Sequence, residues 1–565
     1  MPGGLMQLVG KGAQDQLVNG NPSFTHFRSV YKRHTDFAME HFRLYFKTTN
    51  INLPQSGTLT LRARIEPYAQ MIHDCYLNVQ LPDIFSPVVP VVSPPSSVNS
   101  SSNAIGYEFQ WIKNIGYNMI NYIAITVNGQ EIVRHTGEWM KLYAHLKFDA
   151  NKKAMLDQMT GNVPELYDPA NAYDRMNQYP HAISTSTNPA GPSIAGRTLT
   201  IPLHFWFCES IGSALPLVAL QYSECQFVVE LKNMYQLFTV RDVNPNSATY
   251  GQRIAPDSSS SLFQIPHFLS PPTFADPTVP TNPTLALWNL NPFMECNYVF
   301  LTDQELAHIA KTDHSFIIQQ VDSVRKEGQY GAENDIEMTM RNLCTRVVWV
   351  SQRNDRNAQN DYDNYTNWDD PNKPPLDGTA MLGMTPWYSS GNTQSTSITN
   401  RDILLESSII LDGKERFGYK QTPFFNQLQQ YRFQTGRSTD LPGIYEYSFA
   451  LDHHTTQPSG QINGSQFNKT ILRNTYVQPA YTTSTQAPTQ VCVLKSTAGN
   501  PNPTVVNPNA TDQYGRPLYS PNDLVTIVNK ANTQTFSYTY ITNVYVESYN
   551  FLRVIGGVAN VVFSS

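Results

Sequence analysis

The sequence predicts an all-β chain built from two consecutive antiparallel sandwiches, with a few short helices and long loops. Tyrosine and phenylalanine are abundant, at 31 and 27 residues, and 39 prolines with 30 glycines indicate many turns between short strands. A length of 565 residues exceeds the roughly 250 to 300 residues at which single hydrophobic cores stop growing, so at least two domains are expected. A hairpin signal also occurs in each half of the chain, followed by similar strand signals.

The run Arg197–Leu231 carries the strongest strand signal. Its first part alternates apolar residues at every second position: Leu199, Ile201, Leu203, Phe205 and Phe207. Its second part, from Leu217 to Val229, is rich in β-branched and aromatic residues. We expect two buried strands here, joined by a turn that contains proline and glycine.

The two hairpin signals have the same form. Tyr122–Val133 contains Asn128-Gly129, and Ile409–Phe417 contains Asp412-Gly413. Both dipeptides supply the positive φ angles that a two-residue type I′ turn requires. Each hairpin is later followed by a Leu-Pro pair and a strong strand run, which suggests the duplication of one sandwich.

Two helices are predicted, both as packing elements. Trp139, Leu142, Tyr143 and Leu146 recur at i, i+3, i+4 and i+7, which favours one helix from Glu138 to about Leu156. Thr302 and Glu305 form a capping-box pattern ahead of a second helix.

Composition excludes several classes of protein. A net charge of −6 argues against a chain whose main task is to wrap nucleic acid. The sequence has no run of about 18 apolar residues and no signal-peptide layout at its start, so we expect a soluble, non-secreted protein. Six separated cysteines without a Cys-x-x-Cys pair favour buried, reduced thiols over a metal site: Cys75, Cys208, Cys225, Cys296, Cys344 and Cys492.

The sequence carries no catalytic signature, and neither a cofactor nor a metal is expected. The zincin, nucleophile-elbow, P-loop and dinucleotide patterns are all missing from it. Asp361-Tyr362-Asp363-Asn364 begins like a calcium loop, but Thr366 and Asn372 stand where glycine and glutamate are needed. We expect a solvated acidic loop there.

The segment Phe24–Lys47 is the exception in an otherwise acidic chain, because it interleaves aromatic residues with Arg28, Lys32 and Arg33. Basic groups beside aromatic ones suit an anionic surface, either lipid headgroups or nucleic acid. The alternative is a first strand that packs under the base of the sandwich, and we favour this packing role.

Several blocks of the sequence closely resemble the major capsid proteins of nucleocytoplasmic large DNA viruses, the double jelly-roll family of algal viruses and iridoviruses. The resemblance rests on Ala214–Tyr222 with the preceding Phe-Trp-Phe, the opening from Gly3 to Ala38, Tyr298–Val321, Tyr445–Leu451 and Tyr549–Val554. It implies two eight-stranded jelly rolls and a structural protein without enzymatic activity. It also implies a homotrimer that forms a pseudo-hexagonal capsomer of an icosahedral virion shell.

The resemblance also implies a domain plan and partners. We expect an N-terminal arm (1–23), a first jelly roll (24–241), a linker (242–285) and a second jelly roll (286–565). Expected partners are further copies of the chain and minor capsid and penton proteins, but no specific nucleic acid. The shell would assemble in the host cytoplasm, with the arm on its inward side over an internal membrane. There Arg28, Lys32 and Arg33 would face the membrane.

The long polar loops are expected to form the crown of the capsomer. Three of them contain an Asn-x-Ser/Thr pattern, at Asn99, Asn364 and Asn509, and members of the family are often glycosylated. A second class of function stays open, since jelly rolls also occur in carbohydrate-binding and glycan-processing proteins. Against it stands the lack of a carboxylate pair or metal cluster that can be placed in the sequence.

Overall fold

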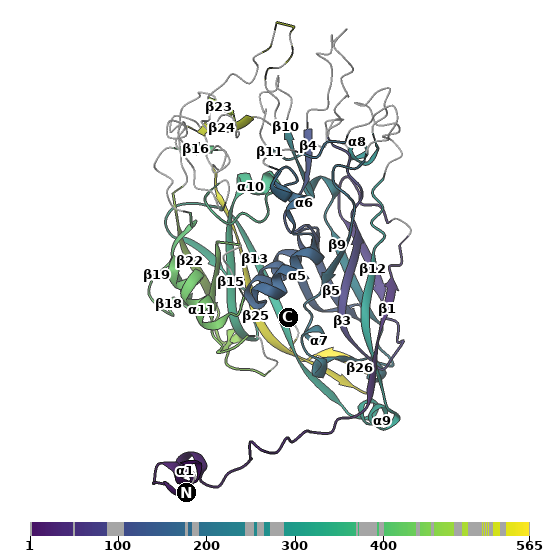
Figure 1. Cartoon of the computed structure of the whole chain (residues 1–565), viewed down its shortest axis with the longest axis vertical. Helices are drawn as coiled ribbons and strands as arrows, with labels where there is room; N and C mark the ends of the chain where they lie inside the picture. Colours follow the sequence, from purple (N-terminus) through teal and green to yellow (C-terminus); the bar gives the residue numbers. More distant parts are fainter. Residues whose placement is uncertain are drawn as a thin grey trace.

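A computed structural model describes the chain over most of its length. The described residues are 3–48, 51–86, 107–175, 179–182, 191–242, 253–256, 265–271, 287–368, 371, 392–394, 401–436, 441–453, 457–478, 489–494, 511, 513–514, 516, 518, 524–530 and 538–563. Two β-sandwiches stand side by side, one drawn mainly in purple to teal and the other in green and yellow (Figure 1).

The first sandwich is made of two sheets, each with four main strands. One has the order β1 (Phe37–Tyr45), β12 (Phe293–Leu301), β3 (Met71–Gln80) and β7 (Thr198–Pro202), with the short β8 (Leu215–Pro216) also paired to β3. The other has the order β2 (Leu59–Arg64), β9 (Cys225–Leu231), β5 (Ile120–Val127) and β6 (Gln130–Thr136). Alternate residues of both sheets point inward and form one hydrophobic core.

The second sandwich repeats this plan. Its first sheet has the order β13 (His314–Gln329), β25 (Tyr540–Ile555), β15 (Leu343–Arg353) and β20 (Ile444–Ser448). Its second sheet has the order β14 (Asn334–Glu337), β22 (Thr470–Tyr476), β17 (Leu404–Leu411) and β18 (Lys414–Glu415), and β19 (Lys420–Gln421) continues the last edge by pairing with β17. The core between these sheets is separate from that of the first sandwich.

The strand order identifies both sandwiches as jelly rolls. When the eight strands of each are counted along the chain, the sheets run 1-8-3-6 and 2-7-4-5 in both sandwiches. Two antiparallel sheets that exchange strands in this Greek-key manner define the jelly roll. The prediction of two consecutive eight-stranded jelly rolls is confirmed.

The predicted domain boundaries need correction. Strand β12 pairs with β1 and β3, so the first jelly roll ends near Leu301 and not at residue 241. The segment expected to be a linker also supplies Ile265 and Phe268, at and inside α8 (Pro266–Leu269), to the first core. The physical reason is that the last strand of a jelly roll lies beside the first one, however long the connection before it.

Both predicted hairpins occur at equivalent places, between the fourth and fifth strands of each jelly roll. Asn128 and Gly129 have φ angles of 50° and 81°, and Asp412 and Gly413 have φ angles of 47° and 77°. These positive values are those of the expected type I′ turn, and they support the duplication that the sequence suggested.

The run Arg197–Leu231 is more broken than predicted. Its first strand, β7, ends at Pro202, which cannot donate a ladder hydrogen bond. Trp206–Glu209 then forms the short helix α7, and a strand resumes only with β9 at Cys225. Phe205 and Phe207 are nevertheless fully buried in the first core.

The first predicted helix is two helices. α4 spans Gly137–Lys147 and α5 spans Ala150–Thr160. The break falls at Asp149, whose carboxylate accepts a hydrogen bond from the Lys152 backbone N–H and starts α5 as its N-cap. The second predicted helix is α9 (Asp303–Lys311), although Thr302 forms no side-chain cap hydrogen bond.

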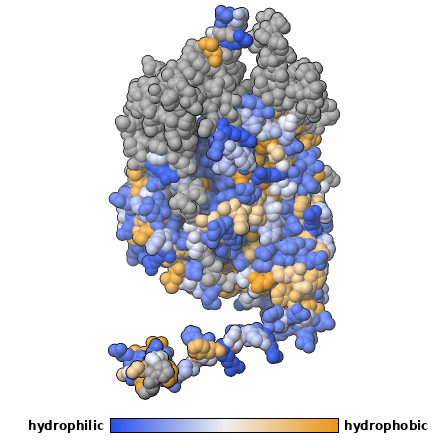
Figure 2. Space-filling view, viewed as in Figure 1, coloured by the Kyte–Doolittle hydropathy of each residue, from blue (hydrophilic) through white to orange (hydrophobic). Residues whose placement is uncertain are grey.

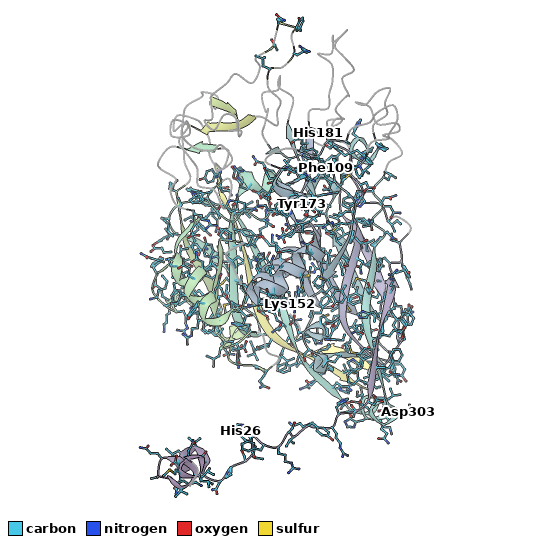
Figure 3. All side chains as sticks on the ribbon, in the orientation of Figure 1. His26, Phe109, Lys152, Tyr173, His181 and Asp303 are labelled. Carbon is cyan, nitrogen blue, oxygen red and sulfur yellow. The ribbon has the colours of Figure 1, made fainter. Side chains whose placement is uncertain are left out.

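The long axis of the molecule has two different ends (Figure 1). At one end lie two small sheets, β4 (Tyr107–Trp111) with β10 (Phe238–Asp242) and β11 (Arg253–Ile254), and β16 (Asn392–Gln394) with β23 (Thr489–Leu494) and β24 (Leu524–Lys530). At the other end lies α9, beginning at Asp303, and the N-terminal arm hangs beyond it (Figure 3). This end is called the base below.

The remaining short helices lie outside the two strand frameworks. They are α1 (Gly3–Val9), α2 (Asp15–Asn19), α3 (Ile115–Asn118), α6 (Pro164–Tyr167), α10 (Asn354–Ala358) and α11 (Gln429–Phe433). The last strand, β26 (Val558–Val561), pairs with β25 and lies toward the base (Figure 1).

Candidate functional site: the interdomain junction and the N-terminal arm

Helix α4 joins the two jelly rolls. Its Met140 and Ala144 pack into the first core, beneath the helix. Its opposite side presents the four predicted apolar residues to the second jelly roll, in a cluster with Val348, Val350, Ile444 and Tyr545. Because Val347 and Trp349 of β15 point into the second core instead, α4 covers the outer face of the sheet β13-β25-β15-β20. We call this contact the interdomain junction.

Glu138, in the first turn of α4, forms hydrogen bonds with two parts of the second jelly roll, the segment that contains Tyr365 and strand β25. Its carboxylate accepts hydrogen bonds from the Tyr365 hydroxyl at 2.7 Å, the Asn543 amide at 2.6 Å and the Tyr545 hydroxyl at 2.5 Å. An acid in the first turn also interacts favourably with the helix dipole. Burial, followed by the nearby Glu138 charge, raises the pKa of both tyrosines, which therefore stay protonated as donors.

A buried ion pair also crosses the junction. The Lys141 ammonium lies 2.5 Å from the Asp363 carboxylate, and both side chains are at most 4% exposed. Asp363 also accepts hydrogen bonds from the amides of Asn114 and Asn118. Burial alone would raise the pKa of Asp363, but Lys141 and the two amides outweigh it and hold the pKa below its ordinary value. The prediction of a solvated acidic loop at 361–364 is wrong for this residue.

Arg346 of β15 is the third polar element of the junction. It is fully buried between two carboxylates, with Glu547 in direct contact and Glu446 at 3.6 Å. Its guanidinium also lies 5.5 Å from the ring centre of Trp139 and 5.6 Å from that of Tyr143. Burial raises the pKa of Glu446 to about 7, against the opposing effect of Arg346. Charged groups so deep in a contact require this fixed arrangement of partners.

Two residues that follow α11 in the second jelly roll also donate hydrogen bonds to the end of α4. The Gly436 N–H donates to the Leu146 carbonyl at 2.7 Å, and the Thr435 hydroxyl donates to the Lys147 carbonyl at 2.5 Å. A Cβ atom on Gly436 would come within 2.1 Å of the His145 carbonyl oxygen, so only glycine fits there. These bonds satisfy carbonyls that the last turn of a helix leaves free.

The N-terminal arm, residues 3–36, extends away from both sandwiches. Figure 2 shows it separate from the body, and Figure 3 places His26 midway along it. Every residue from Phe24 to Asp36 is exposed, including Arg28, Lys32 and Arg33, and Phe27 is 99% exposed. The favoured packing role is therefore wrong for residues 24–36. It is confirmed for the rest of the segment, because the first strand begins at Phe37, Leu44 lies in the first core, and Phe42 and Phe46 pack against it.

The three predicted glycosylation positions differ in what the structure describes. Asn99 and Asn509 lie outside the described residues. Asn364 is fully buried, and its amide donates to the Trp368 carbonyl while its oxygen accepts from Thr366. A glycan has no access to this side chain in the folded chain, so we no longer propose it as an acceptor.

Five of the six cysteines have described side chains, and these are all unpaired: Cys75, Cys208, Cys225, Cys296 and Cys344. Burial raises the pKa of Cys75 well above its ordinary value, and it raises those of Cys225 and Cys344 to about 12. The thiolate, which is the reactive form, is therefore suppressed.

Titration of the denatured, unreduced protein with a thiol reagent should find six free thiols. Buried neutral thiols oxidise slowly in the folded protein, and the spacing of the cysteines suggests that the protein is made in a reducing compartment. The measurement is the absorbance of the released chromophore per chain. A control sample reduced beforehand should give the same value. Two or more missing thiols, restored by reduction, would contradict the expected compartment.

The described residues contain no group of three or more histidine, cysteine or acidic side chains that is arranged to hold a metal ion. Within the same described part, no helix is long and apolar enough to cross a membrane.

Two family models match the chain, one in each half. Residues 25–270 match the major capsid protein N-terminus, and residues 305–507 match the large eukaryotic DNA virus major capsid protein. The major capsid protein of Paramecium bursaria Chlorella virus 1 is 24% identical and is aligned over the whole of both chains. That of Phaeocystis pouchetii virus is also 24% identical, over 84% of this chain and 92% of its own.

Solved capsid structures share the fold. A subunit of the PBCV-1 virus capsid, at 19% identity, superposes with a TM-score of 0.58 over 96% of this chain and all of its own. The Faustovirus major capsid protein, at 13% identity, superposes with a TM-score of 0.58 over 98% of this chain and 96% of its own.

The paired jelly rolls and these similarities place the molecule among the double jelly-roll capsid proteins. The chain belongs to the family of major capsid proteins of large eukaryotic DNA viruses, which are structural subunits of the icosahedral virion shell and not enzymes. The family resemblance seen in the sequence is thereby confirmed, and the carbohydrate-related alternative loses its support.

Proposed function

We propose that three copies of the chain form a closed capsomer with six similar sides, which fills the hexagonal positions of the shell. The observation that carries this proposal is the identical strand order of the two jelly rolls. Three chains with two similar sandwiches each offer six comparable edges to neighbouring capsomers. Closed symmetric rings are also the common form of homo-oligomers.

The interdomain junction supports the proposal. Each jelly roll would form one side of the capsomer, so the two jelly rolls of a chain must be held at a fixed angle to each other. Apolar packing, the Lys141–Asp363 pair and the Glu138 hydrogen bonds all act between the same two jelly rolls. Minor capsid and penton proteins would then bind the assembled capsomers and not the single chain. We expect no specific recognition of nucleic acid.

The purified protein should behave as a trimer. Three chains of 63.7 kDa correspond to about 191 kDa by light scattering after size exclusion. The mass should stay constant on dilution through the micromolar range if the trimer is obligate. A monodisperse 63.7 kDa particle would contradict the proposal.

We further propose that the arm lies on the inward side of the shell, where Arg28, Lys32 and Arg33 face the anionic headgroups of an internal membrane. All three are exposed in the arm, which lies at the base end of the molecule (Figure 3), and exposed aromatic residues lie between them. Such a mixture suits the membrane interface, where basic groups meet headgroups and aromatic rings enter the boundary layer.

Two arm variants should leave folding intact. Removal of residues 1–22, or replacement of Phe24, Phe27 and Tyr31 by alanine, should change the melting temperature little, because these residues lie outside both cores. Circular dichroism with heating measures this, and electron microscopy of assembly reactions should show deformed or missing shells for the deletion. Normal shells from the deletion variant would show that the arm is not an assembly element.

A further inference from the structure

Three of the free cysteines lie together in the first jelly roll. Cys75 of β3 lies directly opposite Cys296 of β12 in the register of the two strands. Residues paired in this way point to the same side of a sheet, and both side chains enter the first core, where they are 1% and 0% exposed. Cys208, in α7, packs against the same core. We call these three residues the thiol cluster.

Two hydrogen bonds hold the segment that contains α7 against β3 (Figure 1). The Leu203 N–H donates to the Cys75 carbonyl at 3.0 Å, just before the helix. The His73 ring donates from Nδ1 to the carbonyl of Phe207, the residue before Cys208. Both bonds come from β3 residues next to the thiol cluster or within it, so the position of α7 beside Cys75 is fixed by the backbone.

Strand β3 is irregular at the thiol cluster. Asp74 is an extra residue that the register of β3 and β12 skips, and its φ of 20° is uncommon for a residue other than glycine. Ile72 and Cys75 both face the first core, although residues three apart on a regular strand point to opposite sides. The bulge at Asp74 therefore turns Cys75 inward, toward the other two thiols.

Cys75 is the shared member of the cluster. Hydrogen bonds between thiols connect it to both Cys208 and Cys296. Burial, followed by these neighbouring thiols, raises the pKa of Cys75 well above its ordinary value. Cys75 and Cys296 are buried, whereas Cys208 is partly exposed. The cluster should therefore stay reduced until an oxidant reaches Cys208, and the Cys75 thiol is then close enough to react with it.

We propose that the thiol cluster is a redox-sensitive site, at which hydrogen peroxide converts Cys208 and Cys75 into a disulfide. The peroxide transfers one oxygen to the Cys208 sulfur, which gives a sulfenic acid and one water molecule. The Cys75 sulfur then displaces the hydroxyl group, so the S–S bond forms and a second water molecule leaves with the Cys75 proton. The two thiols lose two electrons, and the peroxide gains them. This inference does not depend on the proposed trimer.

The disulfide would stabilise the first jelly roll. It closes a loop from residue 75 to residue 208, and a cross-link over a long loop restricts the unfolded chain. In a reducing cytoplasm the thiols would stay free. The cross-link would form only when the protein meets an oxidising medium, and reduction would reverse it.

Counting thiols after oxidation tests the site. The folded protein is treated with hydrogen peroxide, then denatured and alkylated, and the alkyl groups are counted by mass spectrometry. We expect the parent to lose two of its six reactive thiols and to regain both after treatment with dithiothreitol. Cys208→Ser should keep all its remaining thiols. Cys225→Ser is the matched control, because Cys225 is 4% exposed but lies on β9 of the opposite sheet, and this variant should lose two thiols like the parent.

Two further variants test the assigned pair. In Cys75→Ser the sulfenic acid of Cys208 should persist and be trapped by dimedone, because the thiol that would displace its hydroxyl group is missing. Cys296→Ser should still lose two thiols. The oxidised parent should also unfold at a higher urea concentration than oxidised Cys208→Ser.

Several results would contradict the proposal. A parent that keeps all six thiols, or a Cys208→Ser variant that loses two as the parent does, would overturn the site. Full protection in Cys296→Ser, or no dimedone adduct on Cys208 in Cys75→Ser, would overturn the pairing of Cys208 with Cys75. Equal urea midpoints for the oxidised parent and oxidised Cys208→Ser would overturn the stabilising role.

Discussion

Replacement of Lys141 by methionine should destabilise the protein by about 3 to 5 kcal/mol, the range for removing one partner of a buried ion pair. The Asp363 carboxylate would stay buried with only the amides of Asn114 and Asn118. The change in unfolding free energy can be measured by denaturant titration. The double variant Lys141→Met with Asp363→Leu should recover much of the loss, because it removes the uncompensated charge as well.

A matched control uses an exposed pair on the same fold. Arg325 and Glu327 lie 2.8 Å apart with side chains 47% and 64% exposed, so Arg325→Met should cost less than about 1 kcal/mol. Similar losses for both lysine and arginine variants would show that the Lys141–Asp363 pair is not specially important.

The same pair predicts a dependence on acid. The folded-state pKa of Asp363 lies below its ordinary value of 3.8, so its ionised form stabilises the native state above that pH. This contribution is lost as the pH falls through the folded-state pKa. The unfolding free energy of the parent should therefore fall relative to that of the double variant as the pH is lowered, because the double variant lacks this carboxylate.

Replacement of Trp139 by alanine should cost about 3 to 5 kcal/mol, the range for deleting a large buried aromatic side chain. Trp139 is 2% exposed, packs against Tyr545 at 5.4 Å between ring centres, and lies beside Arg346. The substitution removes packing at the junction between the two cores and so weakens the coupling between the jelly rolls. Calorimetry should therefore show the single thermal unfolding transition broaden or split into two. Phe27→Ala, at a position 99% exposed, is the control and should melt like the parent.

An unchanged unfolding transition in the Trp139 variant would mean that the junction contributes little to stability. The angle between the jelly rolls would then have to be set by neighbouring chains. In that case the capsomer edge would be defined only after assembly.

Local signals in the sequence predicted local structure well. The Asn128-Gly129 and Asp412-Gly413 turns follow from the φ angles that these residues tolerate. The apolar stripe of α4 was also predicted, but a stripe shows only that one side is buried and not what buries it. The role of α4 as a link between domains therefore required the fold.

The errors came from contacts between distant parts of the chain. β12 pairs with β1 although more than 200 residues separate the two strands in the sequence, so no local signal predicts this pairing. Asp363 looked solvated because acidic residues in a polar segment usually are, and its partner Lys141 lies far away in sequence. The part of the aromatic segment before Phe37 looked buried on composition alone, although it is exposed in the single chain, whereas the part after it forms the first strand as predicted.

Electron microscopy of the purified protein in negative stain would show directly whether three chains form a capsomer with six similar sides. We expect class averages with threefold symmetry and six lobes of similar size, one for each jelly roll of three chains. Elongated particles with only two lobes, the size of one chain, would contradict it.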